Sequence, residues 1–371
     1  MSIEDLMERR RLLICCGSGG VGKTTTAAAL GVKAALMGKK AAVLTIDPAR
    51  RLANSLGLKA LSNEERRIPE GEFAKFGLSP KGELFALMLD TKRTFDKIIE
   101  RYSTSDETKN AVLQNTLYQH LSNMIAGSQE YMAMEKVYEL YQKQDYDLLV
   151  LDTPPTQHAL DFLEAPQKMI HAVTDSMLKW FLKPGIFMGR TGLRFLQKGA
   201  RKILKVFDSV AGFDFLQDLS AMLISTAGLL EGFKERAQEV SSLLKDPKTA
   251  FLLVTSPQSM VVSEALYFHD KILEFDLPFA GFIVNRVHIN SGFLKYLPTM
   301  LKALQSSALN EKQREGVTRI LKSYGTLVEQ DQSQLKLLKE RVENKNQLTL
   351  VPNLESDVHD LAGLAELGKY L

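Results

Sequence analysis

Residues 17 to 26 read Gly17-Ser18-Gly19-Gly20-Val21-Gly22-Lys23-Thr24-Thr25-Thr26 and follow directly on the apolar run Leu12–Cys16. This order predicts a buried strand, a glycine-rich loop and then a helix. Glycines let consecutive backbone N–H groups point at phosphate oxygens, and the start of a helix adds the positive end of its dipole. Lys23 supplies a mobile cation and Thr24 supplies a hydroxyl for Mg²⁺. The segment therefore predicts a site for a nucleoside triphosphate with Mg²⁺.

An alternative interpretation of the same loop is a dinucleotide site, because its letters also fit Gly17-x-Gly19-x-x-Gly22. Asp47 ends the next apolar run at about the distance where dinucleotide folds place their ribose-binding acid. A nicotinamide-dependent oxidoreductase is therefore one rival function. Against it, the pair Lys23-Thr24 directly after the last glycine is what a triphosphate with Mg²⁺ requires. The residues expected to bind the nucleotide phosphates are Gly19, Gly20, Val21, Gly22, Lys23, Thr24 and Thr25.

Length and composition indicate a globular protein with a large core, since the chain has 371 residues of which 45% are hydrophobic. The formal net charge of +3 is small, so no nucleic-acid partner is expected. The first residues lack the apolar centre of a signal peptide, and no apolar run of about 18 residues is present. We expect a cytoplasmic protein, with peripheral membrane association left open.

Only two cysteines occur, Cys15 and Cys16, and they are neighbours in the first predicted strand. A disulfide framework is therefore excluded, and so is a four-cysteine zinc or iron–sulfur site within one chain. Residues inside a parallel sheet are expected to be buried. We therefore interpret both thiols as core side chains.

Seven apolar runs resemble buried strands, and helical patterns separate nearly all of them. They are Leu12–Cys16, Ala41–Ile46, Leu84–Leu89, Leu148–Leu151, Ala250–Thr255, Phe279–Val284 and Leu348–Val351. Continuous apolar strands that alternate with helices predict an α/β fold with a doubly wound, mainly parallel sheet. The carboxyl ends of such strands share one edge, where the glycine loop, Asp47, Asp152 and Asn285 are expected to meet.

Two long stretches, about 92–145 and about 157–245, have helical character and no strand-like run. No linker rich in Pro or Gly interrupts the chain. We therefore expect one domain over 1–371, with these two stretches forming an inserted α-helical subdomain.

Two aspartates end predicted strands at the expected ligand edge. Asp152 follows Leu148–Leu151, a placement that lets a carboxylate hold Mg²⁺ directly or through water. Asp47 is placed to orient or deprotonate the attacking water, although Asp before Pro48 is also a helix-start signal. The segment after Asp152, through His158, is the natural place for a switch that senses the γ-phosphate.

These motifs together resemble the ArsA family of P-loop ATPases, whose members serve arsenite pumps and the targeting of tail-anchored membrane proteins. The resemblance rests on the glycine loop, Asp47-Pro48-Ala49, residues 152–158 (Asp-Thr-Pro-Pro-Thr-Gln-His) and Val351-Pro352, in that order along most of the chain. It implies an ATP hydrolase of the SIMIBI class that works as a nucleotide-gated dimer, with ATP or ADP and Mg²⁺ at the interface.

The resemblance also implies roles for individual residues. Lys23, Asp47 and Asp152 would be catalytic: Lys23 would hold phosphate, Asp47 would activate water and Asp152 would stabilise the Mg²⁺ that Thr24 also binds. Asn285, Pro352 and Asn353 would flank the adenine base. An asparagine amide suits this role because it offers both a donor and an acceptor.

The chain departs from the family at Ser18, where relatives carry a lysine that reaches the partner subunit's phosphates. A serine hydroxyl has neither the length nor the charge for that contact. Either a homodimer hydrolyses ATP slowly, or a related subunit that keeps the lysine pairs with this chain; a third possibility is another cation, such as Arg50 or Arg51. We favour the heterodimer. An arsenite carrier is not expected, because As(III) needs convergent thiolates. The zinc-bridging cysteine pair of some targeting relatives is also missing.

The helical stretches offer candidates for client or membrane binding. Residues 176–207 contain eight basic residues, no acidic one and several aromatic residues. This pattern predicts a basic amphipathic helix that binds an anionic membrane surface or an acidic partner. The alternative is a helix that packs its apolar face on the core and leaves its basic face in water. Methionines at 124, 132 and 134 suit a groove for a hydrophobic client, or ordinary core packing. A MinD-like membrane organiser is a further alternative, although its terminal membrane helix is poorly matched by the acidic segment 357–371.

Overall fold

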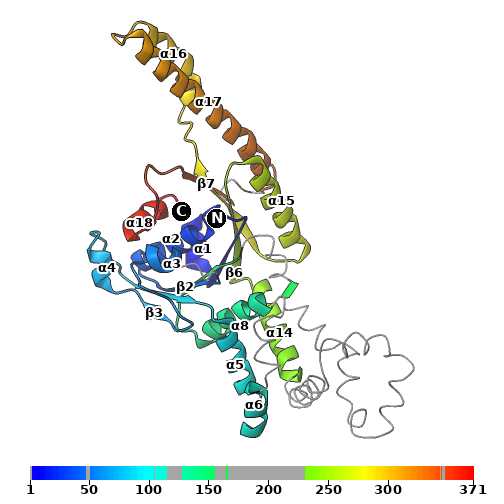
Figure 1. Cartoon of the computed structure of the whole chain (residues 1–371). Coiled ribbons are helices and arrows are strands. Elements are labelled where there is room, and N and C mark those ends of the chain that lie inside the picture. Colours follow the sequence, from blue (N-terminus) through cyan, green and yellow to red (C-terminus); the bar gives the residue numbers. More distant parts are fainter. Residues whose placement is uncertain are drawn as a thin grey trace, which may run out of the picture. The chain divides into compact units, whose positions relative to one another are not determined.

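The computed structural model describes residues 2–46, 51–103, 105–114, 128–154, 164–165, 230–342, 344 and 347–371 (Figure 1). The chain divides into two compact units. Unit 1 comprises residues 1–88, 140–160 and 245–371, and it contains the sheet. Unit 2 comprises residues 89–139 and 161–244, and its described part is helical.

Unit 1 is built on an eight-stranded sheet with the order β3-β4-β2-β5-β1-β6-β7-β8. Every neighbouring pair is parallel except β3 and β4. The strands are β1 (Leu12–Cys16), β2 (Lys40–Thr45), β3 (Arg66–Arg67), β4 (Glu83–Met88), β5 (Leu148–Asp152), β6 (Thr249–Thr255), β7 (Phe279–Val287) and β8 (Leu348–Pro352). The predicted doubly wound, mainly parallel sheet is confirmed, and each of the seven apolar runs forms a strand.

The central strands are buried on both faces, which explains their continuous apolar sequences. Every residue of β1, β5 and β6 is buried. Strands covered on both faces need no polar alternate positions, so their sequences read as unbroken apolar runs. The edge strand β3 differs, because both of its arginines are exposed.

Two of the described helices of unit 1, the one that follows β1 and the last one in the chain, pack against each other. The helices of this unit are α1 (Ile3–Arg9), α2 (Lys23–Leu36), α3 (Arg51–Ser55), α4 (Glu70–Ala74), α15 (Ser259–Glu274), α16 (Phe293–Gln305), α17 (Glu311–Lys339) and α18 (Leu361–Gly368). Helix α18 packs on α2, where Lys33 Nζ donates to the Gly368 carbonyl at 3.1 Å (Figure 1). Leu361, Leu364 and Leu367 of α18 are buried in the same core as α2. The apolar face of this helix is therefore used inside unit 1.

Helices α16 and α17 form a hairpin between β7 and β8, and the sequence-based expectations do not include it. Asn310 begins α17 with a capping box, in which its side chain accepts from the Gln313 N–H and the Gln313 side chain accepts from the Asn310 N–H. At the base of the hairpin, the Asp331 carboxylate accepts a hydrogen bond from the His288 backbone N–H at 2.7 Å. Leu335 and Leu338 of α17 are fully buried. The proximal half of α17 is thus part of the core of unit 1.

Unit 2 contains α5 (Thr91–Tyr102), α6 (Asp106–Leu113) and the greater parts of α8 (Ser128–Lys143) and α14 (Leu230–Lys245). A buried ion pair joins two of these helices, since Arg236 donates from Nε and Nη2 to the Glu135 carboxylate at 2.8 to 2.9 Å. The Arg236 guanidinium also lies 3.9 Å from the centre of the Tyr138 ring. Across the described residues of both units, no helix is long and apolar enough to cross a membrane.

Candidate nucleotide-binding site

The glycine loop connects the end of β1 to the start of α2. Strand β1 lies at the centre of the sheet, between β5 and β6. Gly22 caps α2 with a left-handed backbone (φ +97°) and provides no side-chain cap for the first N–H groups of the helix. A Cβ at this position would lie 2.5 Å from Asn285 Nδ2. Both the backbone angle and the lack of space therefore require glycine here. Such a glycine at a helix N-terminus is typical of a phosphate-binding loop.

Lys23 is the first residue of α2, and its side chain folds back over the loop. Its Nζ donates to the Ser18 carbonyl at 2.9 Å, and the residue is buried. The cation thus lies across the loop that is expected to receive the phosphates. Release of this contact would let the amine turn toward a phosphate oxygen.

Asp152, the last residue of β5, joins three of the central elements through one carboxylate oxygen. Its Oδ2 accepts from Thr24 Oγ1 at 2.7 Å and from Thr45 Oγ1 at 2.9 Å. The carboxylate is almost fully buried, with 1% of the residue exposed. The sequence-based expectation had placed Thr24 and Asp152 at the same edge, and the structure brings them into contact. Thr45 was not foreseen, because its contact with Asp152 depends on β2 and β5 being neighbours in the sheet.

The donors at this point suit Mg²⁺, because a carboxylate and a hydroxyl are the hard oxygen ligands that this ion prefers beside phosphate oxygens. Within the described residues no group of three or more His, Cys, Asp or Glu side chains could hold a metal by themselves. A site of one carboxylate and one hydroxyl fits an ion that arrives together with a phosphate ligand.

Cys15 and Cys16 are fully buried, as expected, and lie directly beside this cluster. Burial raises the pKa of the Cys16 thiol to about 12 and raises the pKa of Cys15 well above its ordinary value. Thr153, which follows Asp152, donates from Oγ1 to the Cys15 carbonyl at 2.9 Å. Both thiols are therefore protonated core groups at neutral pH.

Asn285 of β7 holds the glycine loop through a hydrogen bond to the loop backbone. Its Nδ2 donates to the Val21 carbonyl at 2.9 Å, and its Oδ1 accepts from the Arg286 N–H at 2.9 Å. An amide has two N–H hydrogens and two acceptor lone pairs, so one of each remains beyond these bonds. Pro352 ends β8, and the Asn353 N–H donates to the Val287 carbonyl at 2.9 Å. The residues expected to flank adenine thus lie at the ends of two neighbouring strands.

Ser18 makes a contact that the sequence did not indicate. Its hydroxyl donates to Glu264 Oε2 of α15 at 2.5 Å, and the residue is 4% exposed. Ser18 is therefore enclosed within its own chain by a contact with α15.

Several predicted features lie outside the described residues. These are Asp47, Arg50, the switch segment after Pro154 and the basic segment 176–207. Of the methionines considered for a client groove, Met132 and Met134 are buried in α8. These two side chains therefore serve core packing, whereas Met124 is outside the described residues.

Comparison with known proteins matches residues 10–292 to the family described as Anion-transporting ATPase. The chain is 29% identical over 278 residues to a protein of Aquifex aeolicus described as an arsenical pump-driving ATPase; the match covers 75% of this chain and 63% of that protein. It is 25% identical to ATPase GET3 of Malassezia globosa, with 77% of this chain and 76% of that protein covered. It is 23% identical to ATPase GET3A of Arabidopsis thaliana, with 77% and 70% covered.

The family match includes the glycine loop, the strands β1 to β7 and the contact between Thr24 and Asp152. It ends one residue before α16, so the hairpin lies beyond it. The chain therefore belongs to the anion-transporting ATPase family and is a P-loop ATPase of the ArsA type.

Proposed function

We propose that this chain is a Mg²⁺-dependent ATPase that works as a nucleotide-gated dimeric switch and couples ATP binding and hydrolysis to a hydrophobic client or a partner protein. The observation that carries this proposal is the contact of Thr24 and Thr45 with one oxygen of Asp152, directly beside the glycine loop. This cluster combines the hydroxyl and carboxylate that a Mg²⁺-bound triphosphate requires.

Strand order argues against the rival dinucleotide enzyme. In that fold the strand bearing the glycine loop lies next to the strand that follows it in sequence. Here β5 separates β1 from β2, because β1 pairs with β5 and β6. The end of β2 is therefore one strand further from the loop than the strand end that carries the ribose-binding acid in a dinucleotide fold.

In the proposed mechanism, Lys23 leaves the Ser18 carbonyl and pairs with a phosphate oxygen of ATP, while the first N–H groups of α2 bind the same phosphates. Thr24 and Asp152 would hold Mg²⁺, which supplies charge neutralisation on the phosphates when bound. Asp47 would orient the attacking water and accept its proton. Thr153 and Pro154 directly follow Asp152 and lead into the proposed switch segment. A shift of the Asp152 carboxylate on binding Mg²⁺ would therefore move the start of that segment directly.

Ser18 underlies the proposal of a second, related subunit. A serine already bonded to Glu264 within its own chain lacks the length and charge to neutralise phosphate across an interface. We therefore favour a heterodimer in which a subunit that keeps the loop lysine completes this chain's site. A homodimer with slow turnover is the alternative.

A MinD-like organiser remains the second candidate, and α18 bears on it. The apolar residues of this helix are buried against α2 rather than presented outward. Any membrane contact of this chain must therefore come from another segment.

The proposal is tested by Asp152→Asn, with Asp147→Asn as a matched control at the other end of β5. Asp147 is exposed and accepts from the Lys40 N–H. We expect Asp152→Asn to lower Mg²⁺-dependent ATP hydrolysis by about 100-fold or more, because the loss removes charge stabilisation in the transition state, and Asp147→Asn to keep normal turnover. Equal turnover in both variants would remove the metal role from Asp152.

The heterodimer is tested by Ser18→Lys in the purified chain. Restoring the cation is expected to raise ATP turnover of this chain alone toward that of a mixture with a co-purifying relative. If the unmodified chain alone already matches that mixture, the reason for a second subunit disappears.

A further inference from the structure

The hairpin formed by α16 and α17 begins where the family match ends. Its distal half, the part away from the sheet that comprises α16 and the first half of α17, exposes large apolar side chains. No residue of α16 is buried, although Phe293–Gln305 contains aromatic, leucine and methionine side chains. Tyr296 is 52% exposed, Met300 is 40% exposed and Ile320 of α17 is 67% exposed. Side chains of this kind at one end of a soluble unit indicate a contact surface.

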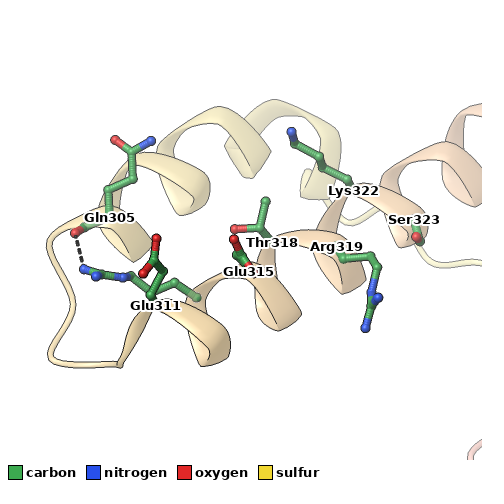
Figure 2. A pocket seen from close by; sticks show the side chains of 8 residues that line it. Gln305, Glu311, Glu315, Thr318, Arg319, Lys322 and Ser323 are labelled. Carbon is green, nitrogen blue, oxygen red and sulfur yellow. Dashed lines mark hydrogen bonds between the residues drawn. The ribbon is translucent and has the colours of Figure 1, made fainter.

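One face of the hairpin, here called the hollow face, is polar and carries all of the carboxylates of the distal half. Figure 2 shows the side chains that line a hollow on this face, where Arg314 donates to the Gln305 carbonyl at 3.1 Å. The lining residues are Gln305, Glu311, Arg314, Glu315, Thr318, Arg319, Lys322 and Ser323.

The opposite side, here called the apolar face, consists of Tyr296, Met300, Ala303, Ile320 and Leu327. At about 100° per residue, Ile320 lies half a turn around α17 from Glu311 of the hollow. Met300 lies about 140° around α16 from Gln305 by the same geometry. Gly325 approaches Leu297 closely. Counted from this point along the two antiparallel helices, Leu327 is expected near Tyr296 and Ile320 near Ala303. The five side chains therefore form one stripe across both helices.

Basic side chains border this stripe along both outer edges. Lys295 and Lys302 lie on the outer side of α16, and Lys312 lies on the outer side of α17. Between His288 and Asn310 the chain has no acidic residue. The carboxylates of Glu311 and Glu315 are confined to the hollow face. An apolar stripe with basic edges is the arrangement of helices that lie in the surface of an anionic membrane.

We propose that the apolar face of the α16–α17 hairpin docks on an anionic lipid surface. The stripe would enter the boundary of the acyl chains, and the three lysines would meet lipid phosphates.

The base of the hairpin is fixed to the sheet, so a docked hairpin would hold unit 1 at the membrane. Asp331 is buried and binds both the backbone N–H and the ring Nδ1 of His288, at 2.7 and 2.9 Å. Tyr324 donates from its hydroxyl to the Ile289 carbonyl at 3.2 Å. These contacts tie α17 to the end of β7. This inference names one partner of the proposed switch, and it can fail alone because lipid binding is measured without nucleotide.

The test is sedimentation of the full chain with phosphatidylcholine vesicles, with and without phosphatidylserine, in the absence of nucleotide. We expect binding to the phosphatidylserine vesicles only, and weaker binding at high salt. Ile320→Glu should weaken binding more than tenfold. The matched control Thr318→Glu adds the same charge two residues away on the hollow face and should leave affinity within twofold.

Lys302→Ala supplies a second variant that leaves the apolar stripe intact. It should weaken binding about fivefold, which corresponds to about 1 kcal/mol for one basic side chain near a charged surface. No sedimentation of the unmodified chain, or equal losses for Ile320→Glu and Thr318→Glu, would overturn the proposal. So would an unchanged lipid affinity of Ile320→Glu together with a fall from dimer to monomer in light scattering, which would assign this face to a second copy.

Discussion

Substitution of Gly22 by alanine tests how the loop is held by β7. Gly22 has φ +97°, and Gly20 of the same loop has φ +78°. A Cβ at Gly20 would meet nothing within 4 Å, whereas a Cβ at Gly22 would lie 2.5 Å from Asn285 Nδ2. Gly20→Ala therefore carries only the left-handed backbone cost of about 1 to 2 kcal/mol. It serves as the matched control for Gly22→Ala.

Gly22→Ala must in addition displace Asn285, whose Nδ2 donates to the Val21 carbonyl. Asn285 is buried, so its displacement loses the hydrogen bond and leaves a polar group unsatisfied, at about 1 to 3 kcal/mol. We expect Gly22→Ala to lower the free energy of unfolding of the nucleotide-free protein by about 2 to 5 kcal/mol.

Urea unfolding followed by circular dichroism measures these losses, and Asn285→Ala completes a double-mutant cycle. Once Asn285 is shortened, Gly22→Ala should cost no more than Gly20→Ala, so the two substitutions should couple by about 1 to 3 kcal/mol. Equal losses for Gly20→Ala and Gly22→Ala, or an additive cycle, would refute the steric argument.

Two further predictions concern the buried charges and thiols. Arg236→Met should lower the stability of unit 2 by about 3 to 5 kcal/mol, because it leaves the Glu135 carboxylate buried without its bidentate partner. In thermal unfolding, the double variant with Glu135→Met should lose less stability than Arg236→Met. An equal or larger loss of stability in the double variant would contradict this reasoning. Burial raises the pKa of Cys16 from 9.0 to about 12, so between these values the unfolded thiol loses its proton while the folded thiol keeps it. Stability should therefore fall as pH rises from 9 toward 12, by up to about 1.4 kcal/mol per pH unit. Cys16→Ala should show a smaller fall in urea unfolding across the same range, and an identical fall would assign the pH dependence to other groups.

The sheet could be predicted from the sequence because its strands are covered on both faces. Burial of every residue in β1, β5 and β6 leaves a short apolar run whose length identifies it as a strand. The edge strand β3 was missed because Arg66 and Arg67 are exposed and form only two residues of antiparallel pairing with β4. Nothing in a pair of arginines distinguishes such a strand from a loop.

The contact of Thr24 with Asp152 could be anticipated because both belong to known positions of a phosphate loop and a neighbouring strand end. Thr45 and Glu264 could not, because their partners are 107 and 246 residues away in sequence and depend on which strands and helices become neighbours. The strand order β2-β5-β1-β6 brings Thr45 beside Asp152. Sequence patterns indicate that strands exist but not their order.

The α16–α17 hairpin was also missed, although its sequence contains helix signals. Asn310 and Gln313 form a capping box, but Pro298 lies inside α16, where proline usually ends a helix. A helix with no buried residue lacks the core contacts from which a fold is inferred.

The central claim is that the loop around Lys23 binds ATP with Mg²⁺, and calorimetric titration of the nucleotide tests it most directly. The unmodified chain should bind Mg²⁺–ATP, and Lys23→Ala should lose measurable binding. Lys39→Ala, which removes a half-buried lysine paired with Glu8, should bind normally. Retained affinity in Lys23→Ala, or binding of NAD(P) in place of ATP by the unmodified chain, would contradict the account.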